Sequence, residues 1–406
     1  MKTMYLFIRY VLVIFALSTF VGILSGCKEE NISAHTTSET IFTLQVKAIS
    51  DPQNKKYVVV GDQNGNVLSY KELKANTTLT FNKPENYTGN ELTITYIYWN
   101  ATYNSYNLVT TQQVKTGSEW TWDNGIPAAP PTYSAAFQVT NVPPNIFRLV
   151  ASSSGNGSLQ PGISYPLTLH QTSENIRMRL EYTDTQPNKY YLLQNVQPNK
   201  NYIVDLSAFE TGISKTLTLK ESGFGLQIVS MGIIKENKSE GVFEDGITRH
   251  PNLEQPITSF YVTYPNVSVD NFWMYTALDK DLSQSTLYEK EQLQVFLTSS
   301  SIPDVLPTLD ADFEVQNASF QNFQMTTTGE HDSYTVGWSK VVANPTPDNP
   351  TLSWAIIGNS QGVVTAQLPS VPQELIQTIP ADLKCRYIQL SKGSGENTSS
   401  RTKMLK

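Results

Sequence analysis

Short segments in which apolar and polar residues alternate constrain the fold of this chain more than any other feature. Residues 41–48 alternate with the period of two that a strand with one buried face requires. Residues 57–60 and 67–70 repeat the pattern, and Asn64-Gly65 between them is a strong signal for a hairpin turn. Further segments of this kind occupy residues 77–81, 91–98 and 106–114. About six short strands in roughly 90 residues predict a β-sandwich over residues 39–124.

Breaks in this pattern divide the rest of the chain. Gly125 to Pro131 contains three prolines within five residues, so residues 125–132 are predicted to form a stiff linker. Residues 133–224 form a second predicted β-sandwich, and residues 225–390 form a larger β-rich region that is either one domain or two. Residues 391–406 are rich in Ser, Gly and Lys and are predicted to be a disordered tail.

One corner of the second sandwich carries a family resemblance. Residues 193–206 read Leu-Gln-Asn-Val-Gln-Pro-Asn-Lys-Asn-Tyr-Ile-Val-Asp-Leu, and this spacing resembles the E–F corner of fibronectin type III and other immunoglobulin-like modules. The resemblance implies that Tyr202 is the corner tyrosine, whose hydroxyl bonds a backbone group upstream. The chain lacks the core tryptophan that the family carries on an earlier strand. The resemblance implies an architecture and no activity.

The N-terminus has the features of a secretory signal. Lys2 and Arg9 are the only charges before an apolar run at residues 10–24, which is too short to cross a bilayer comfortably. The run ends in small residues directly before Cys27. Leu24-Ser25-Gly26-Cys27 resembles the lipobox of bacterial lipoproteins, and an ordinary secretory signal with an incidental cysteine is the alternative. The resemblance implies that residues 1–26 are removed and that acyl chains on Cys27 hold the protein in the outer membrane.

The residues after Cys27 suggest which side of that membrane the protein occupies. Lys28-Glu29-Glu30 resembles the export signal of Bacteroidetes-type surface lipoproteins, which implies a cell-surface location. A lipoprotein that faces the periplasm is the alternative. Residues 27–38 are polar and without periodicity, so they are predicted to be the lipidated cysteine and its flexible tether. The predicted fold class is therefore all-β, with tandem immunoglobulin-like β-sandwich domains behind a lipoprotein signal and a flexible tether.

Composition agrees with this fold and argues against one class of partner. The chain has 21 Tyr and 16 Phe, residue types that favour half-buried strands over helices. Its formal net charge is −7, and removal of Lys2 and Arg9 with the signal makes it −9. A mildly acidic chain does not favour nucleic acid as a partner.

The chain contains one candidate for a catalytic serine. Gly358-Asn359-Ser360-Gln361-Gly362 resembles the nucleophile elbow of the α/β-hydrolases. That fold places its histidine after the serine, whereas no histidine follows His331 here. The next segment, residues 363–368, is β-branched and runs into Pro369, which disfavours the helix that follows the elbow. We therefore predict a hairpin turn at residues 358–362 and no catalytic role for Ser360.

Metal and acid–base sites have weak support. Asp62, Asn64 and Asn66 imitate the start of an EF-hand loop, but Val67 and Leu73 replace its required Gly and Glu, which leaves only adventitious Ca²⁺ open. The histidines lie far apart, at His35, His170, His250 and His331. Glycoside hydrolysis needs two paired carboxylates, and the sequence cannot pair the available Asp123, Glu244, Asp245, Asp310 and Asp312. Cys385 lies in an alternating segment and is predicted to be buried. We predict no cofactor, no metal and no catalytic residues.

Aromatic residues beside amides are the remaining candidates for ligand binding. Exposed aromatic faces can stack on sugar rings while amides bond sugar hydroxyls. The candidate glycan-binding residues are Tyr98, Trp99, Tyr103, Trp120 and Trp122. The alternative for the first group is a strand that buries Tyr96 and Tyr98 and turns at Asn100.

The sequence thus predicts a lipid-anchored, non-enzymatic cell-surface protein that presents β-sandwich domains for binding or adhesion. A glycan-capturing accessory lipoprotein of a nutrient-uptake system is the first alternative, and an extracellular hydrolase is the second. A pocket that joins two carboxylates would favour the hydrolase. Glycans and surface proteins are the partners considered besides the membrane.

The lipobox generates the first testable prediction. Cys27→Ser removes the thiol that the acyl chains require, so the variant is expected to lose its membrane anchor. Fractionation of cells should then move the protein from the outer-membrane fraction to a soluble fraction. A variant that stays firmly in the outer membrane would contradict the lipoprotein interpretation.

Overall fold

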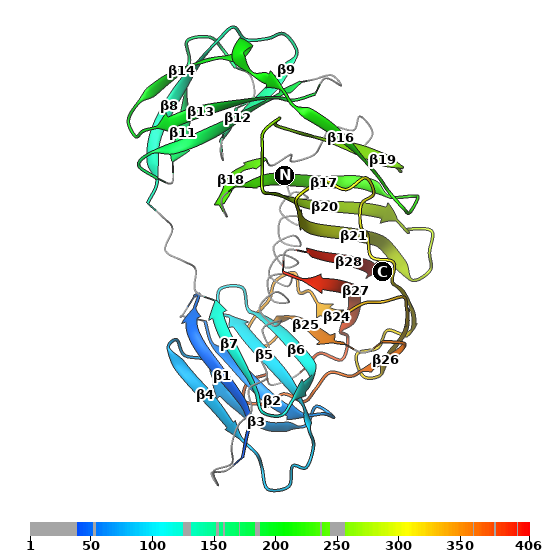
Figure 1. Cartoon of the computed structure of the whole chain (residues 1–406). Helices are drawn as coiled ribbons and strands as arrows, with labels where there is room; N and C mark the ends of the chain where they lie inside the picture. The colour runs from blue at the N-terminus through cyan, green and yellow to red at the C-terminus, as the bar shows by residue number, and fades with distance from the viewer. Residues whose placement is uncertain are drawn as a thin grey trace. The chain divides into compact units, whose positions relative to one another are not determined.

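The computed structural model describes residues 39–406, apart from 52–53, 125–130, 152–153, 157–158, 170, 183–186, 236–237, 244–255, 360, 377–378 and 396. Within these residues the regular structure is β-strand with one short 3₁₀ turn, which confirms the all-β fold class with several sheets (Figure 1). None of the helices in the described ranges has the length and apolar character that a membrane crossing requires. The predicted signal, Cys27 and the tether lie outside the described residues.

The chain forms two compact units, and they do not follow the predicted domain boundaries. Of the described residues, those within 39–124, 282–291 and 309–406 belong to the first unit, and those within 131–281 and 292–308 belong to the second. The region at 225–390, predicted to form one domain or two, is divided between both units. The predicted linker at 125–132 lies largely outside the described residues.

The first unit is built from three groups of strands. Its largest sheet runs in the order β28-β27-β24-β25-β6-β5-β2-β3, and two three-stranded sheets are ordered β4-β1-β7 and β22-β23-β26. The N-terminal strands are β1 (Thr40–Ile49), β2 (Lys56–Asp62), β3 (Val67–Glu72), β4 (Thr77–Asn82), β5 (Glu91–Asn100), β6 (Ser105–Lys115) and β7 (Ser118–Asn124). The C-terminal strands are β22 (Asp312–Asn317), β23 (Phe323–Thr328), β24 (Ser333–Lys340), β25 (Thr351–Gly358), β26 (Val363–Ala366), β27 (Lys384–Ser394) and β28 (Asn397–Leu405).

The large sheet of this unit is covered on both faces, because alternate residues of its strands enter different cores. Val59 of β2 packs with the apolar residues of β22, β23 and β26, whereas its neighbours Val58 and Val60 pack with those of β1 and β4. Ile97 and Ile94 of β5 divide in the same way. Successive side chains of a strand point to opposite faces, so the two small sheets lie on opposite sides of the large one.

A parallel pairing joins the two distant parts of the chain in this unit. β6 pairs with β25 in parallel, with Leu108 opposite Trp354. The predicted separate sandwich at residues 39–124 is therefore wrong, because β6 lies inside a sheet that continues into the C-terminal part of the chain. The local alternation was read correctly, and the predicted hairpin is confirmed by the antiparallel pairing of β2 with β3. Alternation shows which residues are buried but not which strand is the neighbour.

A buried hydrogen-bond chain supports this pairing. The indole Nε1 of Trp354 donates to Oγ1 of Thr110 at 2.9 Å, and Oγ1 of Thr95 lies 2.8 Å from the same hydroxyl. All three side chains are buried. Each buried polar group thus has a partner across a strand boundary, which avoids the cost of an unsatisfied donor in the core.

The predicted disordered tail is wrong. Residues 397–405 form β28, which pairs antiparallel with β27. Buried Arg401 donates to Glu291 at 2.6 Å and to the carbonyl of Leu309 at 3.1 Å, and Lys403 donates to Asp312 at 2.5 Å. The polar composition suggested disorder because the residues that neutralise these charges come from other parts of the chain.

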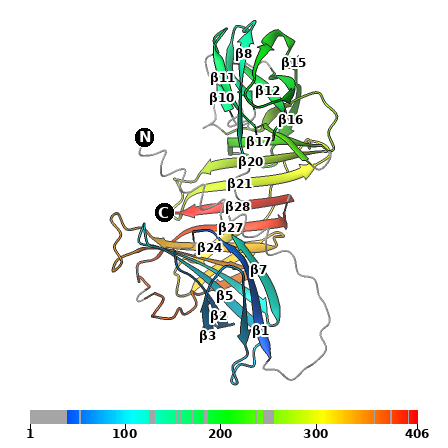
Figure 2. The ribbon, with the colours of Figure 1, turned by 90° about the vertical axis from the view of Figure 1, so that its left-hand side faces the viewer.

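The second unit contains two β-layered cores. In the first, sheets ordered β11-β8-β14 and β10-β9-β12-β13-β15 share one apolar core (Figure 2). In the second, β16 and β19 share a core with β17, β20 and β21. The strands are β8 (Tyr133–Thr140), β9 (Ile146–Ala151), β10 (Ser154–Asn156), β11 (Ser164–Leu169), β12 (Glu174–Tyr182), β13 (Lys189–Val196), β14 (Asn201–Asp205), β15 (Glu210–Thr211), β16 (Ile213–Thr218), β17 (Gly225–Lys235), β18 (Lys238–Phe243), β19 (Ser259–Tyr264), β20 (Asn271–Asp281) and β21 (Tyr288–Ser299).

The tyrosine corner is confirmed and has a counterpart on the other side of β8. The hydroxyl of Tyr202 accepts the backbone N–H of Gln197 at 2.7 Å, five residues upstream. The hydroxyl of Tyr165 accepts the backbone N–H of Gln160 at 2.7 Å, again five residues upstream. Both corners begin with Gln-Pro, and they precede or begin the two strands that flank β8. The chain thus uses one local device twice to fix strands against β8.

Thr110 allows a test of the buried hydrogen-bond chain. Thr110→Val keeps the side-chain shape but leaves the Trp354 N–H without its acceptor, so we expect the free energy of unfolding to fall by about 2 kcal/mol. Urea unfolding of the full chain, followed by tryptophan fluorescence, measures this. Thr111→Val is the matched control. Thr111 is only half-buried and is not part of the buried hydrogen-bond chain, so this change should alter the free energy of unfolding by less than about 0.5 kcal/mol. Equal effects of the two changes would contradict the role of Thr110.

The paired corners allow a second test. Tyr202→Phe removes one hydrogen bond and is expected to cost about 1 kcal/mol locally, so the amide proton of Gln197 should exchange faster with solvent. Tyr165→Phe should do the same to Gln160 and leave Gln197 unchanged. Hydrogen exchange of both amides in each variant provides its own control. Unchanged exchange at the matching glutamine would show that the corner contributes nothing.

Candidate functional site

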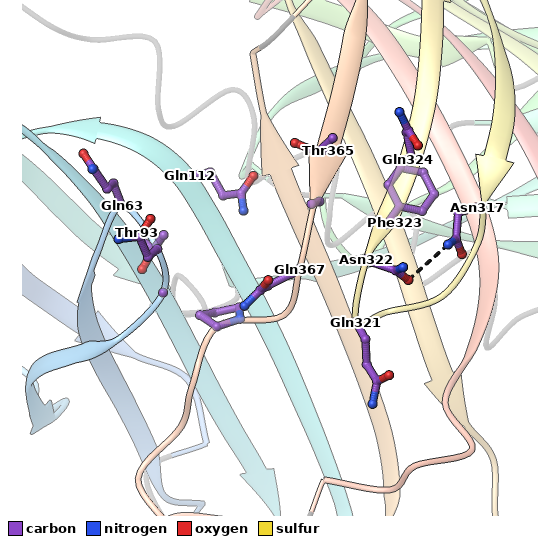
Figure 3. Close-up of a pocket in the computed structure, with 14 residues that line it drawn as sticks. Gln63, Thr93, Gln112, Asn317, Gln321, Asn322, Phe323, Gln324, Thr365 and Gln367 are labelled. Atoms are coloured by element: carbon purple, nitrogen blue, oxygen red, sulfur yellow. Dashed lines mark hydrogen bonds between the residues drawn. The ribbon is translucent and has the colours of Figure 1, made fainter.

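A cavity of the first unit lies where three parts of the chain meet beside the large sheet (Figure 3). It has a volume of about 490 Å³. The turn between β2 and β3, the facing strands β5 and β6, and the segments around β23 and β26 enclose it. The lining residues are Gln63, Asn64, Gly65, Thr93, Gln112, Asn317, Gln321, Asn322, Phe323, Gln324, Thr365, Ala366, Gln367 and Pro369. We call this site the amide-lined cavity.

The chemistry of the lining is unusually uniform. Eight of the lining residues carry side-chain carboxamides, two carry hydroxyls, and none carries a charge. A carboxamide offers both a donor and an acceptor, so the cavity can bond to groups of either kind. Burying an ionised ligand requires an opposite charge, which this lining does not supply. The cavity is therefore matched to an uncharged, hydrogen-bonding ligand.

The turn between β2 and β3 forms one wall and is held in place at both ends. Asp62 Oδ1 accepts the backbone N–H groups of Asn64 and Asn66, each at 2.8 Å. Gly65 adopts φ +80°, and its carbonyl accepts the N–H of Ser370 at 2.8 Å. A Cβ on Gly65 would lie 2.8 Å from Cα of Pro369, so only glycine fits both the turn and this contact.

Two strands supply the base of the cavity. Thr93 on β5 is buried, and its hydroxyl donates to the carbonyl of Asp62 at 3.2 Å. Gln112 on β6 accepts, through Oε1, the hydroxyl of Tyr334 at 2.9 Å. Burial raises the pKa of Tyr334 to about 12, so this hydroxyl keeps its proton at neutral pH.

The loop from β22 to β23 forms the opposite wall. Asn317 Oδ1 accepts the backbone N–H of Ser319 at 2.9 Å, which fixes the orientation of that amide. Asn317 Nδ2 then donates to Asn322 Oδ1 at 3.1 Å (Figure 3). Phe323 beside them is buried, and its ring meets Trp338 edge to face. The polar residues Asn317 and Asn322 are therefore next to a buried, packed aromatic pair.

None of the predicted glycan-binding aromatics lines the amide-lined cavity. Tyr98, Trp99 and Tyr103 lie at the opposite end of the β5–β6 hairpin from Thr93 and Gln112. Tyr98 is half-buried and accepts amide protons from Asn54 and Asn100, and desolvation by burial and a hydrogen bond to Asp51 raise its pKa. Trp99 lies against the ring of Tyr106, with centroids 4.3 Å apart. Tyr103, at the turn, is 57% exposed.

The two tryptophans of β7 contribute to packing. Trp120 meets the buried ring of Phe42 edge to face, and Trp122 stacks on Tyr96 with centroids 4.3 Å apart. Both are partly buried against the core beneath β1. Tyr96, which the alternative for this strand expected to be buried together with Tyr98, is partly buried against the same core, and burial raises its pKa.

Three of the residues considered for catalysis cannot be placed in the structure. Ser360, Glu244 and Asp245 lie outside the described residues. β25 ends at Gly358 and β26 begins at Val363 in another sheet, so the predicted hairpin at 358–362 is wrong and the chain crosses between sheets there. Asp312 bonds Lys403, and neither Asp310 nor Asp123 lines the cavity. Cys385 is buried as predicted, and burial raises its pKa to about 12.

No cluster of metal-ligating side chains occurs in the part of the chain that the structure describes. The EF-hand-like turn uses its aspartate for other bonds, because both oxygens of Asp62 accept hydrogen bonds from Asn64 or Asn66. Sequence reasoning considered this turn only for Ca²⁺ and missed the cavity. The sequence feature that could have predicted the cavity is the local enrichment of Asn and Gln, above all at residues 316–324 and at Gln112-Gln113.

Comparison with known proteins gives little further information. No protein-family model and no curated protein sequence matches the chain. One solved structure, a tetra-tandem repeat in the extending region of a large adhesion protein, is 10% identical, with 90% of this chain and 99% of that chain covered. The TM-score of that match is 0.12, which is too low to support an argument about function.

Proposed function

We propose that this chain is a lipid-anchored, non-enzymatic binding protein on the outer surface of a bacterial cell, and that its amide-lined cavity captures neutral glycans. The observation that carries the binding role is the lining of eight carboxamides and two hydroxyls without a charge. The lipobox at Cys27 and the export-like Lys28-Glu29-Glu30 support the location. Acyl chains there would keep the cavity at the outer membrane, with each buried CH₂ contributing roughly 0.8 kcal/mol.

Carbohydrate is the ligand class that uses this lining most fully. Each sugar hydroxyl both donates and accepts, as each carboxamide does, so several pairs can form at once. A single bond contributes only about 0.5–1.5 kcal/mol net, so useful affinity needs many of them in one place. A volume of about 490 Å³ falls in the usual range for small-molecule sites and can hold a short oligosaccharide.

The lining also favours capture over cleavage. Glycoside hydrolysis generally uses two carboxyl groups that flank the scissile bond. No carboxylate lines the amide-lined cavity, so a bound glycan would meet hydrogen-bonding groups without an acid–base pair. This supports the glycan-capturing alternative from the sequence over the hydrolase.

The proposal predicts selectivity and an unusual insensitivity to conditions. The full chain, solubilised in detergent, should bind neutral oligosaccharides and not those rich in uronic acid or sulfate. Its dissociation constant should change less than about twofold between roughly 0.05 and 0.5 M NaCl, because no ion pair is screened. It should also be constant between about pH 5 and pH 8, because no lining group titrates there. Isothermal titration calorimetry measures all three.

Two outcomes would contradict the proposal. Preferential binding of acidic glycans, with strong salt dependence, would place the binding site elsewhere on the chain. Binding that disappears in Trp99→Ala or Tyr103→Ala, but not when the cavity is altered, would return the role to the aromatic end of the β5–β6 hairpin.

A further inference from the structure

We infer that two amides of the cavity, Gln112 and Asn322, are held with their NH₂ groups toward the ligand and therefore select a glycan by its acceptor oxygens. This inference rests on the proposed function and names the residues that determine its specificity. Asn317 is also fixed, but its NH₂ group donates to Asn322 rather than into the cavity. Tyr334 and Asn317 act as positioning residues, because each hydrogen-bonds one of the two amides and so sets its orientation.

The orientation of Gln112 follows from the needs of Tyr334. The phenol is 2% exposed, and its proton has one acceptor within the described residues, Oε1 of Gln112 at 2.9 Å. If the amide of Gln112 turned over, its NH₂ would face the phenol and the buried O–H would lose its acceptor, which is unfavourable for a buried donor. The oxygen of Gln112 is therefore directed at Tyr334, and its Nε2 is left for the cavity.

The orientation of Asn322 follows from a relay that starts at the backbone. The N–H of Ser319 can only donate, so the atom of Asn317 that it meets at 2.9 Å must be the oxygen. Nδ2 of Asn317 then donates at 3.1 Å to Asn322, which must present its oxygen in turn. Nδ2 of Asn322 is left for the cavity. The backbone N–H of Ser319 thus sets the orientation of the Asn322 amide through two successive hydrogen bonds.

The remaining glutamines of the lining behave differently. Gln63, Gln321, Gln324 and Gln367 are exposed, and within the described residues their side chains make no hydrogen bond. They can present either end of the amide and so tolerate many ligands. Discrimination therefore falls to the two fixed donors.

Fixed donors require atoms that accept. Sugars offer ring and glycosidic oxygens, hydroxyl lone pairs and the carbonyl of an acetamido group. A saccharide that places two such oxygens against Gln112 and Asn322 satisfies both NH₂ groups. A charged acceptor would gain less, because the lining holds no cation to balance its desolvation.

The test uses the full chain in detergent and neutral trisaccharides of glucose, mannose, galactose, xylose and N-acetylglucosamine as probes. Gln112→Glu and Asn322→Asp replace each fixed NH₂ by an acceptor oxygen. Each should weaken the tightest of these probes at least about tenfold, or about 1.4 kcal/mol. Gln45→Glu and Asn82→Asp make the same chemical change at exposed amides outside the cavity lining and should change affinity less than about threefold.

Two further measurements separate donor selection from a structural effect. The affinity of Gln112→Glu should recover as pH falls below about 4, because a protonated carboxyl regains an O–H donor. Tyr334→Phe should reduce the preference among the five probes, because Gln112 can then turn over, while thermal unfolding shows that the fold is intact.

The outcomes distinguish this inference from the proposed function. If the unaltered chain binds none of the neutral trisaccharides, the proposed function fails and the inference fails with it. If it binds them and Gln112→Glu and Asn322→Asp weaken binding no more than the two control substitutions, the chain binds neutral glycans but the two donors do not select them. Loss of affinity in Gln112→Glu and Asn322→Asp alone, with recovery of the first at low pH, would establish the inference.

Discussion

The parallel pairing of β6 with β25 is the interaction on which the first unit depends. It brings together residues that are distant in the sequence. Asn107 and Ser353, for example, are 246 positions apart, and their side chains hydrogen-bond at 2.6 Å. The buried chain from Trp354 through Thr110 to Thr95 secures the contact. Closing so long a loop costs conformational entropy before any contact between the two strands offsets it. The two strands can therefore pair only after both parts of the chain are available for folding. The first unit cannot be completed by its N-terminal residues alone.

The amide-lined cavity is a consequence of that pairing. Its base comes from β5 and β6, and its opposite wall comes from the loops around β23 and β26. The contact between Gly65 and Pro369 and the bond from Tyr334 to Gln112 both cross between these distant segments. A rigid frame matters for a site of this type, because each hydrogen bond is weak and is lost when the amide that makes it must first be ordered. Buried aromatic residues next to the polar lining, such as Phe323 packed against Trp338, contribute to this rigidity.

Buried charges complete the frame. Arg401 and Glu291 are almost fully buried and pair with each other, and the carbonyl of Leu309 satisfies a further donor of the guanidinium. Such a pair adds little net stability relative to apolar residues, but an unpaired member would be strongly destabilising. The pair therefore specifies which segments must meet β28. Like the paired corners at Tyr165 and Tyr202, it favours one arrangement of strands over its alternatives.

The sequence by itself determined what each segment would do locally. Alternation identified the strands, Asn64-Gly65 identified the hairpin of β2 and β3, the spacing around Tyr202 identified a tyrosine corner, and the setting of Cys385 identified a buried position. These features depend on neighbours within a few residues, which the sequence displays directly. Tertiary structure alone decided that β6 would pair with β25, that residues 397–405 would form a strand, and that eight amides would meet in one cavity. Each of these depends on partners far along the chain. A polar segment looks disordered, and an amide looks like ordinary surface, until its distant partners are in place.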